Sequence, residues 1–299
     1  MKGFLCRSLL MEYKDYPGLY QTSDKASLQA QTCYLRAIQF YLILLISGAV
    51  CTLFLGECVI LAIIAAVILL ATLSTSILLA SKRFDKTWYS GRAVAESVKT
   101  ITWRYMMHAE PYHDPDENIT KSIFLNDLRQ ILEQNKQLEH IFTEETATMN
   151  AISSSMAKIR GLSLDDRKNL YLKDRIDDQR DWYCKKAKFN KRQASIWFVV
   201  MCAAQAFALI LVLIRIAKPA WHYLPINILI ICAGAALTWM QTNKFQDLST
   251  AFSLTAHEIC LLREDSANIT NQTEFSHFVN NTESAFSREH TQWQARRQT

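Results

Sequence analysis

Four apolar runs, arranged as two closely spaced pairs, limit what this chain can fold into. They lie at residues 37–56, 58–80, 193–214 and 221–241, and none contains Asp, Glu, Lys or Arg. Each is close to the ~20 residues that a helix needs to cross ~30 Å of hydrocarbon. The sequence therefore predicts an all-α polytopic membrane protein, with four transmembrane helices in two hairpins and a helical cytoplasmic domain.

The second run shows how strongly the sequence favours the membrane. Val59–Leu79 contains thirteen Leu, Ile or Val residues. At their usual contributions, these side chains favour insertion by about 4–8 kcal/mol. The alternative is a buried helical hairpin of a soluble protein, but helices of such proteins carry a polar stripe that this run lacks.

Positive charge is concentrated beside one end of the spans, whereas the short hairpin loops offer only Arg215 and Lys218. Loops rich in Lys and Arg stay in the cytoplasm. Both termini and the central segment are therefore expected to be cytoplasmic, with both hairpin tips outside. The basic residues at the cytoplasmic ends are Lys25, Arg36, Lys82, Arg83, Lys86, Lys185, Lys186, Lys188, Lys191, Arg192 and Lys244.

The segments outside the spans have helical patterns and no strand pattern. The second span continues without a breaker to Ala109, which predicts one helix of about 50 residues, some 75 Å long. Gly161 is expected to stop one helix, and Ser163-x-x-Asp166, just after it, resembles a capping box. It precedes a charged helix that is expected to run from Leu164 into the third span.

The two halves of the chain share this plan at an offset of about 157 residues, which places Trp88 opposite Phe245. We therefore predict a first unit at residues 1–160, with the first two spans and the helices that follow them. The second unit, at residues 161–299, has the other two spans and the C-terminal helices.

Three stretches resemble the SLATT family, two-span effectors found beside nucleotide-sensing and nucleotide-making genes in bacterial conflict systems. Residues 19–31 (LYQTSDKASLQAQ) resemble the helix that leads into the first span of that family. Residues 88–112 (WYSGRAVAESVKTITWRYMMHAEPY) resemble the helix after the hairpin, and residues 283–293 (ESAFSREHTQW) resemble the closing segment. Together they imply a tandem SLATT protein.

The resemblance also implies a function. SLATT effectors damage the membrane or conduct ions, and they are held silent until infection. Control is expected to pass through a nucleotide signal made by a neighbouring nucleotidyltransferase; in the Hailong-type arrangement the signal is an oligonucleotide. This implies a location in the bacterial inner membrane.

No pattern typical of an enzyme is found, and we expect no catalytic residue, cofactor or metal. The chain has no Gly-rich phosphate loop and no G-x-S-x-G motif. The pair His113-Asp114, with Asp116-Glu117, suggests either a metal site or a solvated turn that caps the next helix.

Polar residues inside the spans are the candidates for lining a pore, because polar side chains in hydrocarbon need protein or water. The alternative is hydrogen bonding between helices of one protomer. Glu57, at an outer tip, would form a carboxylate ring that attracts cations, or it is a solvated turn residue. The candidates are Ser47, Thr52, Glu57, Thr72, Thr75, Gln205 and Asn227.

Cationic and aromatic residues on the helix after the second span are the candidates for holding a nucleotide, which needs cations for phosphate and flat surfaces for bases. The alternative is intramolecular packing, with an Arg92–Glu96 ion pair and Trp103 in the core. The basic cluster before the third span contacts either anionic lipid or phosphate. The ligand candidates are Arg92, Lys99, Trp103, Arg104, Tyr105, Lys188 and Arg192.

Our hypothesis is an antiphage effector that forms a homo-oligomeric ion-conducting pore, for which we favour a tetramer. Its cytoplasmic helices would respond to a nucleotide or oligonucleotide signal, and its opening would depolarise the inner membrane. The alternative is a non-conducting membrane scaffold that recruits a cytosolic partner through residues 81–192.

Overall fold

The computed structural model of the chain describes residues 11–53, 59–136, 138, 149–221 and 223–298, the side chains of the last eleven excepted. These residues form helices joined by turns, and no strand occurs among them. The prediction of an all-α protein is confirmed.

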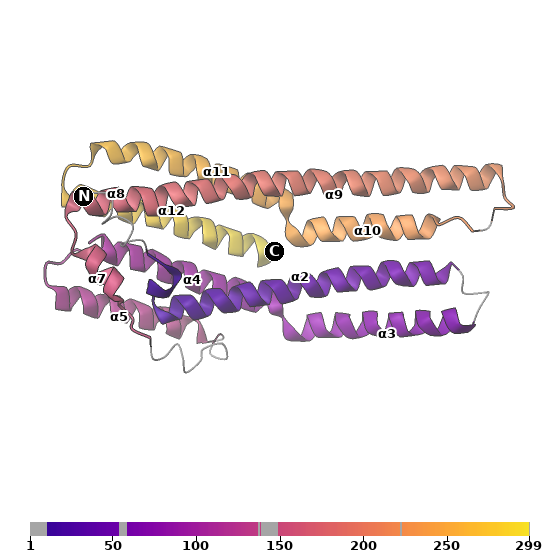
Figure 1. Ribbon diagram of the computed structural model, residues 1–299, viewed down its shortest axis with the longest axis horizontal. Coiled ribbons are helices and arrows are strands. Elements are labelled where there is room, and N and C mark those ends of the chain that lie inside the picture. Colours follow the sequence, from indigo (N-terminus) through magenta and orange to yellow (C-terminus); the bar gives the residue numbers. More distant parts are fainter. Residues whose placement is uncertain (1–10, 54–58, 137, 139–148, 222, 299) are drawn as a thin grey trace. The chain divides into compact units, whose positions relative to one another are not determined.

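Four helices are long and apolar enough to cross a membrane (Figure 1). The spans lie in α2 (Gly18–Thr52), α3 (Val59–Lys82), α9 (Asp178–Ala217) and α10 (Ile226–Asn243). The chain is a multi-pass membrane protein, as predicted. The fourth span was expected to begin at residue 221, but its helix begins after Pro225, the N-cap residue, because proline has no N–H to donate within a helix.

The chain divides into two compact units, which we name the span unit and the polar unit. The span unit comprises Thr32–Phe84 and Cys184–Ser253; the polar unit comprises Met1–Gln31, Asp85–Tyr183 and Leu254–Thr299. In the span unit, small side chains are buried where helices approach, among them Ala49, Ala65, Ala208, Ala233 and Ala236. Small residues at such contacts let helix backbones approach closely in a bilayer.

The polar unit is built around α4 (Phe84–Met106). It also contains α5 (Glu117–Gln134), α7 (Ser154–Arg160), α8 (Leu164–Tyr171), η4 (Leu172–Asp177, a π-helical stretch), most of α11 (Phe245–Asp265) and α12 (Gln272–Gln298). Val98, Trp103 and Met106 of α4 are at most 2% exposed. At Gly91 a Cβ atom would lie 3.0 Å from the Ser23 carbonyl oxygen, so glycine permits α4 to pass close to α2.

The local signals for helix ends in this unit are confirmed. The Ser163 hydroxyl accepts a hydrogen bond from the Asp166 N–H at 3.2 Å, which caps α8. Gly161 is the C-cap residue of α7. The helical run that starts at Leu164 passes through η4 into α9 and ends at Ala217, as predicted.

The prediction of one unbroken helix from the second span to Ala109 is wrong. The helix breaks at Arg83, whose φ of 43° is left-handed, and α4 begins at the next residue. Lys244, with φ of 49°, makes the same break between α10 and α11. Each break is followed by a phenylalanine, so the structural repeat has an offset of 161 residues, in place of the expected 157.

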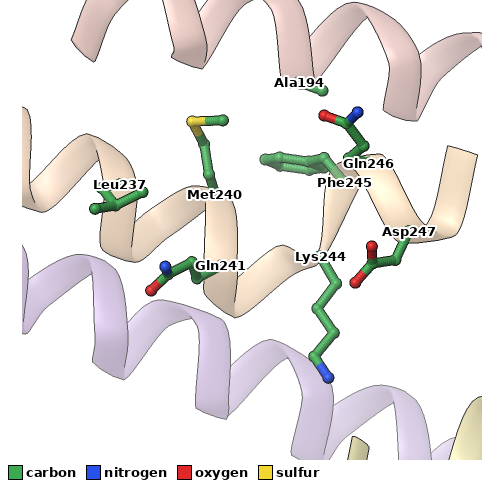
Figure 2. A pocket seen from close by; sticks show the side chains of 8 residues that line it. All are labelled: Ala194, Leu237, Met240, Gln241, Lys244, Phe245, Gln246 and Asp247. Atoms are coloured by element: carbon green, nitrogen blue, oxygen red, sulfur yellow. The ribbon is translucent and has the colours of Figure 1, made fainter. Parts of the chain in front are cut away.

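A hollow of about 290 Å³ lies beside the second break. Figure 2 shows that Phe245 points toward the Met240 side chain, whereas Lys244 extends away from it on the other side of the chain. The left-handed backbone at Lys244 thus accompanies a separation of two neighbouring side chains. The apolar Phe245 ring and the Lys244 cation point to different sides of the chain. The hollow is lined by Ala194, Leu237, Met240, Gln241, Lys244, Phe245, Gln246 and Asp247.

The left-handed break predicts an asymmetry between neighbouring substitutions. Arg83→Gly and Lys82→Gly both remove an exposed cation and both add chain flexibility. Only Arg83→Gly also relieves the left-handed backbone, which costs an L-residue about 1–2 kcal/mol. We therefore expect Arg83→Gly to be more stable than Lys82→Gly by about 1 kcal/mol. Thermal unfolding in detergent measures this difference; equal effects of both substitutions would contradict the break.

Candidate functional site

Three of the pore candidates are threonines whose hydroxyls bond to carbonyls of their own helix. Thr72 donates to Ile68 and Thr75 donates to Ala71, each at 2.8 Å, and Thr52 donates to Ala49 at 2.7 Å. Such bonds satisfy the hydroxyl without any neighbouring helix. Thr72 is buried, Thr75 is half-buried and Thr52 is exposed.

The amide candidates are placed differently from the hydroxyls. Gln205 of α9 and Asn227 in the first turn of α10 are exposed, and neither makes a hydrogen bond among the residues that the structure describes. Ser47 is half-buried in α2. No hydrogen bond joins any two of these six candidates in the described chain. Glu57 lies outside the described residues.

The ligand candidates on α4 lie among intramolecular partners. Arg92 forms an ion pair with Glu96 at 2.5 Å, and it also bonds to Asp24 of α2 at 3.4 Å. This is the Arg92–Glu96 pair of the packing alternative. Both carboxylates are only 10–11% exposed, so the guanidinium is held by two partly desolvated charges.

Three further candidates lie about three turns after Arg92, in the last turn of α4. Trp103 is buried and donates its indole N–H to the Tyr16 hydroxyl at 3.1 Å. Arg104 donates to the Ser284 hydroxyl at 2.8 Å and to the Asn280 carbonyl at 3.3 Å, and both acceptors belong to α12. The buried ring of Tyr105 lies 4.7 Å from that of Phe124. Each side chain therefore has a structural contact.

Lys99 differs from these neighbours. It is half-buried, and among the described side chains it makes no hydrogen bond or ion pair. Burial lowers the pKa of Lys99; Glu96 opposes this effect, and Arg175 adds to it. Lys99 is thus the α4 candidate with free donors. Lys188 and Arg192 are exposed on α9 in the span unit.

The sequence analysis missed a buried ion pair at the centre of the polar unit. Arg175 of η4 contacts Glu283 of α12 through two bonds, Nε to Oε1 at 2.8 Å and Nη2 to Oε2 at 2.7 Å. The two side chains are 2% and 0% exposed. Tyr171 donates its hydroxyl to the same carboxylate at 3.0 Å, and Phe286 lies under the guanidinium at 4.7 Å.

Electrostatics around this pair follow from its burial. Although burial alone would lower the pKa of Arg175, the charge and hydrogen bonds of Glu283 raise it above its ordinary value. Burial raises the pKa of Tyr16 to about 12. A sequence signal for the pair existed, since Glu283 lies on the apolar face of α12 with Val279 and Phe286, at helical spacing.

The C-terminal end of α4 collects two further buried arginines. Arg160 donates to the carbonyls of Tyr105 and Tyr112, and Arg167 donates to the Met107 carbonyl at 2.8 Å. Cations at a helix C-terminus satisfy its free carbonyls and oppose its dipole. Burial and, to a smaller extent, the charge of Arg160 together lower the pKa of Arg167 to about 10.

Two of the four residues that suggested a metal site, Asp114 and Asp116, bond to backbone N–H groups at the start of α5, where Asp116 is the N-cap residue. The Asp114 carboxylate accepts from the Asp116 N–H, and the Asp116 carboxylate accepts from the Asn118 N–H, each at 2.8 Å. Within the described ranges, no three His, Cys, Asp or Glu side chains are grouped so that they could hold a metal ion.

The fold and these contacts define a class: a multi-pass α-helical membrane protein with two span hairpins and a helical polar unit. The family model of the SMODS and SLOG-associating 2TM effector domain 3 matches residues 17–168, and that of domain 1 matches residues 171–293. The chain belongs to the SLATT family and carries two SLATT domains in tandem, two-span effector domains of antiphage conflict systems. No curated protein and no solved structure matches the chain.

The family matches confirm the tandem arrangement that residues 19–31, 88–112 and 283–293 implied. They meet between residues 168 and 171. The boundary at 160/161 stays a prediction, and so do the pore and ligand roles of the candidate residues.

The buried pair predicts a large and specific loss of stability. Glu283→Gln should destabilise the protein by about 3 kcal/mol or more, because Arg175 would stay buried without a counter-charge. The double variant Arg175→Met/Glu283→Leu should recover most of that loss. Thermal unfolding in detergent measures both. The control is Asp177→Asn, which breaks the more exposed pair with Arg263 and should cost at most about 1 kcal/mol.

His108 predicts a pH dependence of stability. Burial lowers its pKa to about 4, whereas an unfolded histidine titrates near 6.5. Between these values the unfolded chain binds more protons, so this contribution to stability is present above pH ~6.5 and is lost as the pH falls toward ~4. His108→Asn tolerates the positive φ of 52° and should show a flatter slope. Unfolding curves across this range measure it; identical slopes would contradict the burial of the neutral ring.

Proposed function

We propose that the chain assembles as a homo-oligomer, with a tetramer favoured, whose spans conduct ions across the bacterial inner membrane. Opening would depolarise the membrane of an infected cell. The control would be a nucleotide or oligonucleotide signal from a neighbouring nucleotidyltransferase, received by the polar unit. Both termini and the polar unit would face the cytoplasm, on the side of the basic clusters, and no catalytic step is proposed.

The observation that carries the proposal is the outward placement of the amide side chains in the spans. Gln205 and Asn227 lie on the exposed surface of the protomer, and no hydrogen bond to another described residue satisfies them. The apolar windows of the spans are only 6–17% buried within one chain. Lipid cannot bond to these amides, so they need water or another copy. An oligomeric pore offers both water and a second copy of the chain.

The polar unit supplies the elements for control. Two helices, α2 and α9, each contribute residues to both units without a helix break at the division. A ligand shifts such a protein only if it binds one arrangement more tightly than the other. Lys99 has donors without a partner among the described residues. We therefore propose Lys99 as the cation that meets a phosphate of the signal.

Reconstitution in liposomes tests both parts of the proposal. The purified full chain should dissipate a potassium diffusion potential, read with a voltage-sensitive dye, and a panel of linear and cyclic oligonucleotides should contain a member that changes this flux. Lys99→Met should reduce the response by about tenfold in ligand concentration, the size expected from one lost charge-assisted bond. Flux without ligand should stay the same, since Lys99 lies outside the span unit.

The matched control is Lys188→Met, which removes the same charge from an exposed position on α9. It should respond to the oligonucleotide as the unchanged protein does. Oligomers that hold the potential with and without every oligonucleotide would contradict conduction and favour the non-conducting scaffold. Equal losses in Lys99→Met and Lys188→Met would contradict the assignment of Lys99.

A further inference from the structure

Gln205 occupies the least favourable depth in the membrane for an amide. It lies near the middle of the third apolar run, residues 193–214, in helix α9 (Figure 1). The other amide candidate, Asn227, lies in the first turn of α10, where interfacial water is near. The transfer penalty for polar groups is greatest at the centre of the hydrocarbon. Gln205 therefore needs a partner at that depth.

The protomer supplies no partner for Gln205. The side chain is exposed, and it makes no hydrogen bond in the described part of the chain. By contrast, Thr72 and Thr75 bond to their own helix. A glutamine amide carries two donors and an acceptor, and lipid tails offer neither, so the partner must be protein or trapped water.

The face of α9 around Gln205 suits a close helix contact. Cys202, Gln205, Ala206 and Leu209 share one face at helical spacing, and all four are exposed. Ala208, three residues after Gln205 and 6% exposed, marks the edge of this face, where α9 is covered within the protomer. Two small residues beside the amide let another backbone approach, as at helix interfaces in membranes.

We propose that this face of α9 is where a second copy of the chain packs, with the Gln205 amides of neighbouring copies hydrogen-bonded to each other. The proposal rests on the proposed homo-oligomer and identifies its interface. A second copy with the same topology places its own Gln205 at the same depth. An amide is complementary to itself, since each copy donates N–H and accepts at C=O.

Association in the bilayer tests the role of the amide. Gln205→Met keeps the length of the side chain and removes its hydrogen bonds. It should weaken association by about threefold to twentyfold per contact, the range for one interhelical side-chain bond in membranes. Gln205→Asn keeps an amide and should retain more of the association. Subunit exchange in liposomes, measured by energy transfer between labelled copies, gives the association constants.

Disulfide cross-linking tests the position. In a Cys202→Ser background, Gln205→Cys should form a cross-linked dimer, because a disulfide requires Cα atoms of two copies within about 7 Å. The matched control is Phe207→Cys, at nearly the same depth but on the opposite side of α9, where Phe207 is 61% exposed. The cross-linked fraction should be several-fold higher for residue 205 than for residue 207.

The outcomes separate this inference from the proposed function. An oligomer that persists unchanged in Gln205→Met and cross-links no better at 205 than at 207 would overturn the interface and leave the pore proposal standing. A protein that is monomeric before any substitution, by native mass spectrometry from liposomes, would overturn both.

Discussion

The structure depends on one constraint: hydrocarbon offers no hydrogen bonds. Inside a bilayer each backbone group must be paired within the protein, and a helix pairs them all without help from neighbours. The span hydroxyls obey the same constraint, since Thr72, Ser74 and Thr75 bond to carbonyls of their own helix. Gln205 cannot do so at a comparable cost, because its amide needs several partners at once. Gln205 thus leaves hydrogen-bonding groups unpaired within the described part of one protomer, near the middle of a span.

In the polar unit the same constraint acts on charges. Arg175 is buried and donates from Nε and Nη2 to Glu283, and Tyr171 donates its hydroxyl to the same carboxylate. Removing either charge therefore leaves the other one buried without its counter-charge. Arg160 and Arg167 are buried without a carboxylate, but they bond to carbonyls at the end of α4, where the helix dipole is negative. Lys99, by contrast, makes neither an ion pair with a carboxylate nor a hydrogen bond to a carbonyl among the described residues. This distinguishes it from Arg92 and Arg104, the other cationic ligand candidates of α4.

What the sequence could predict was local. Spans, the cap at Ser163 and the stop at Gly161 depend on residues a few positions apart, and all are found in the structure. The break at Arg83 was missed because a basic residue in the left-handed region carries no signal of its own, unlike glycine. The Arg175–Glu283 pair joins residues more than a hundred positions apart, and only the carboxylate on an apolar face of α12 hinted at it. The candidate residues of α4 were placed on the correct helix, but their partners in α2 and α12 depend on tertiary packing.

The contacts of the polar unit also show why two SLATT domains occur in one chain. Trp103 and Met107, in the first family match, contact Tyr171 and Gln272 of the second. Arg104 bonds to α12 across the same division. The core of the polar unit is therefore completed only when both matches are present, although each match carries its own span hairpin. Under the proposed gating, a signal bound in this shared core would act on helices that belong to both domains, whereas two separate domains would have to respond one by one.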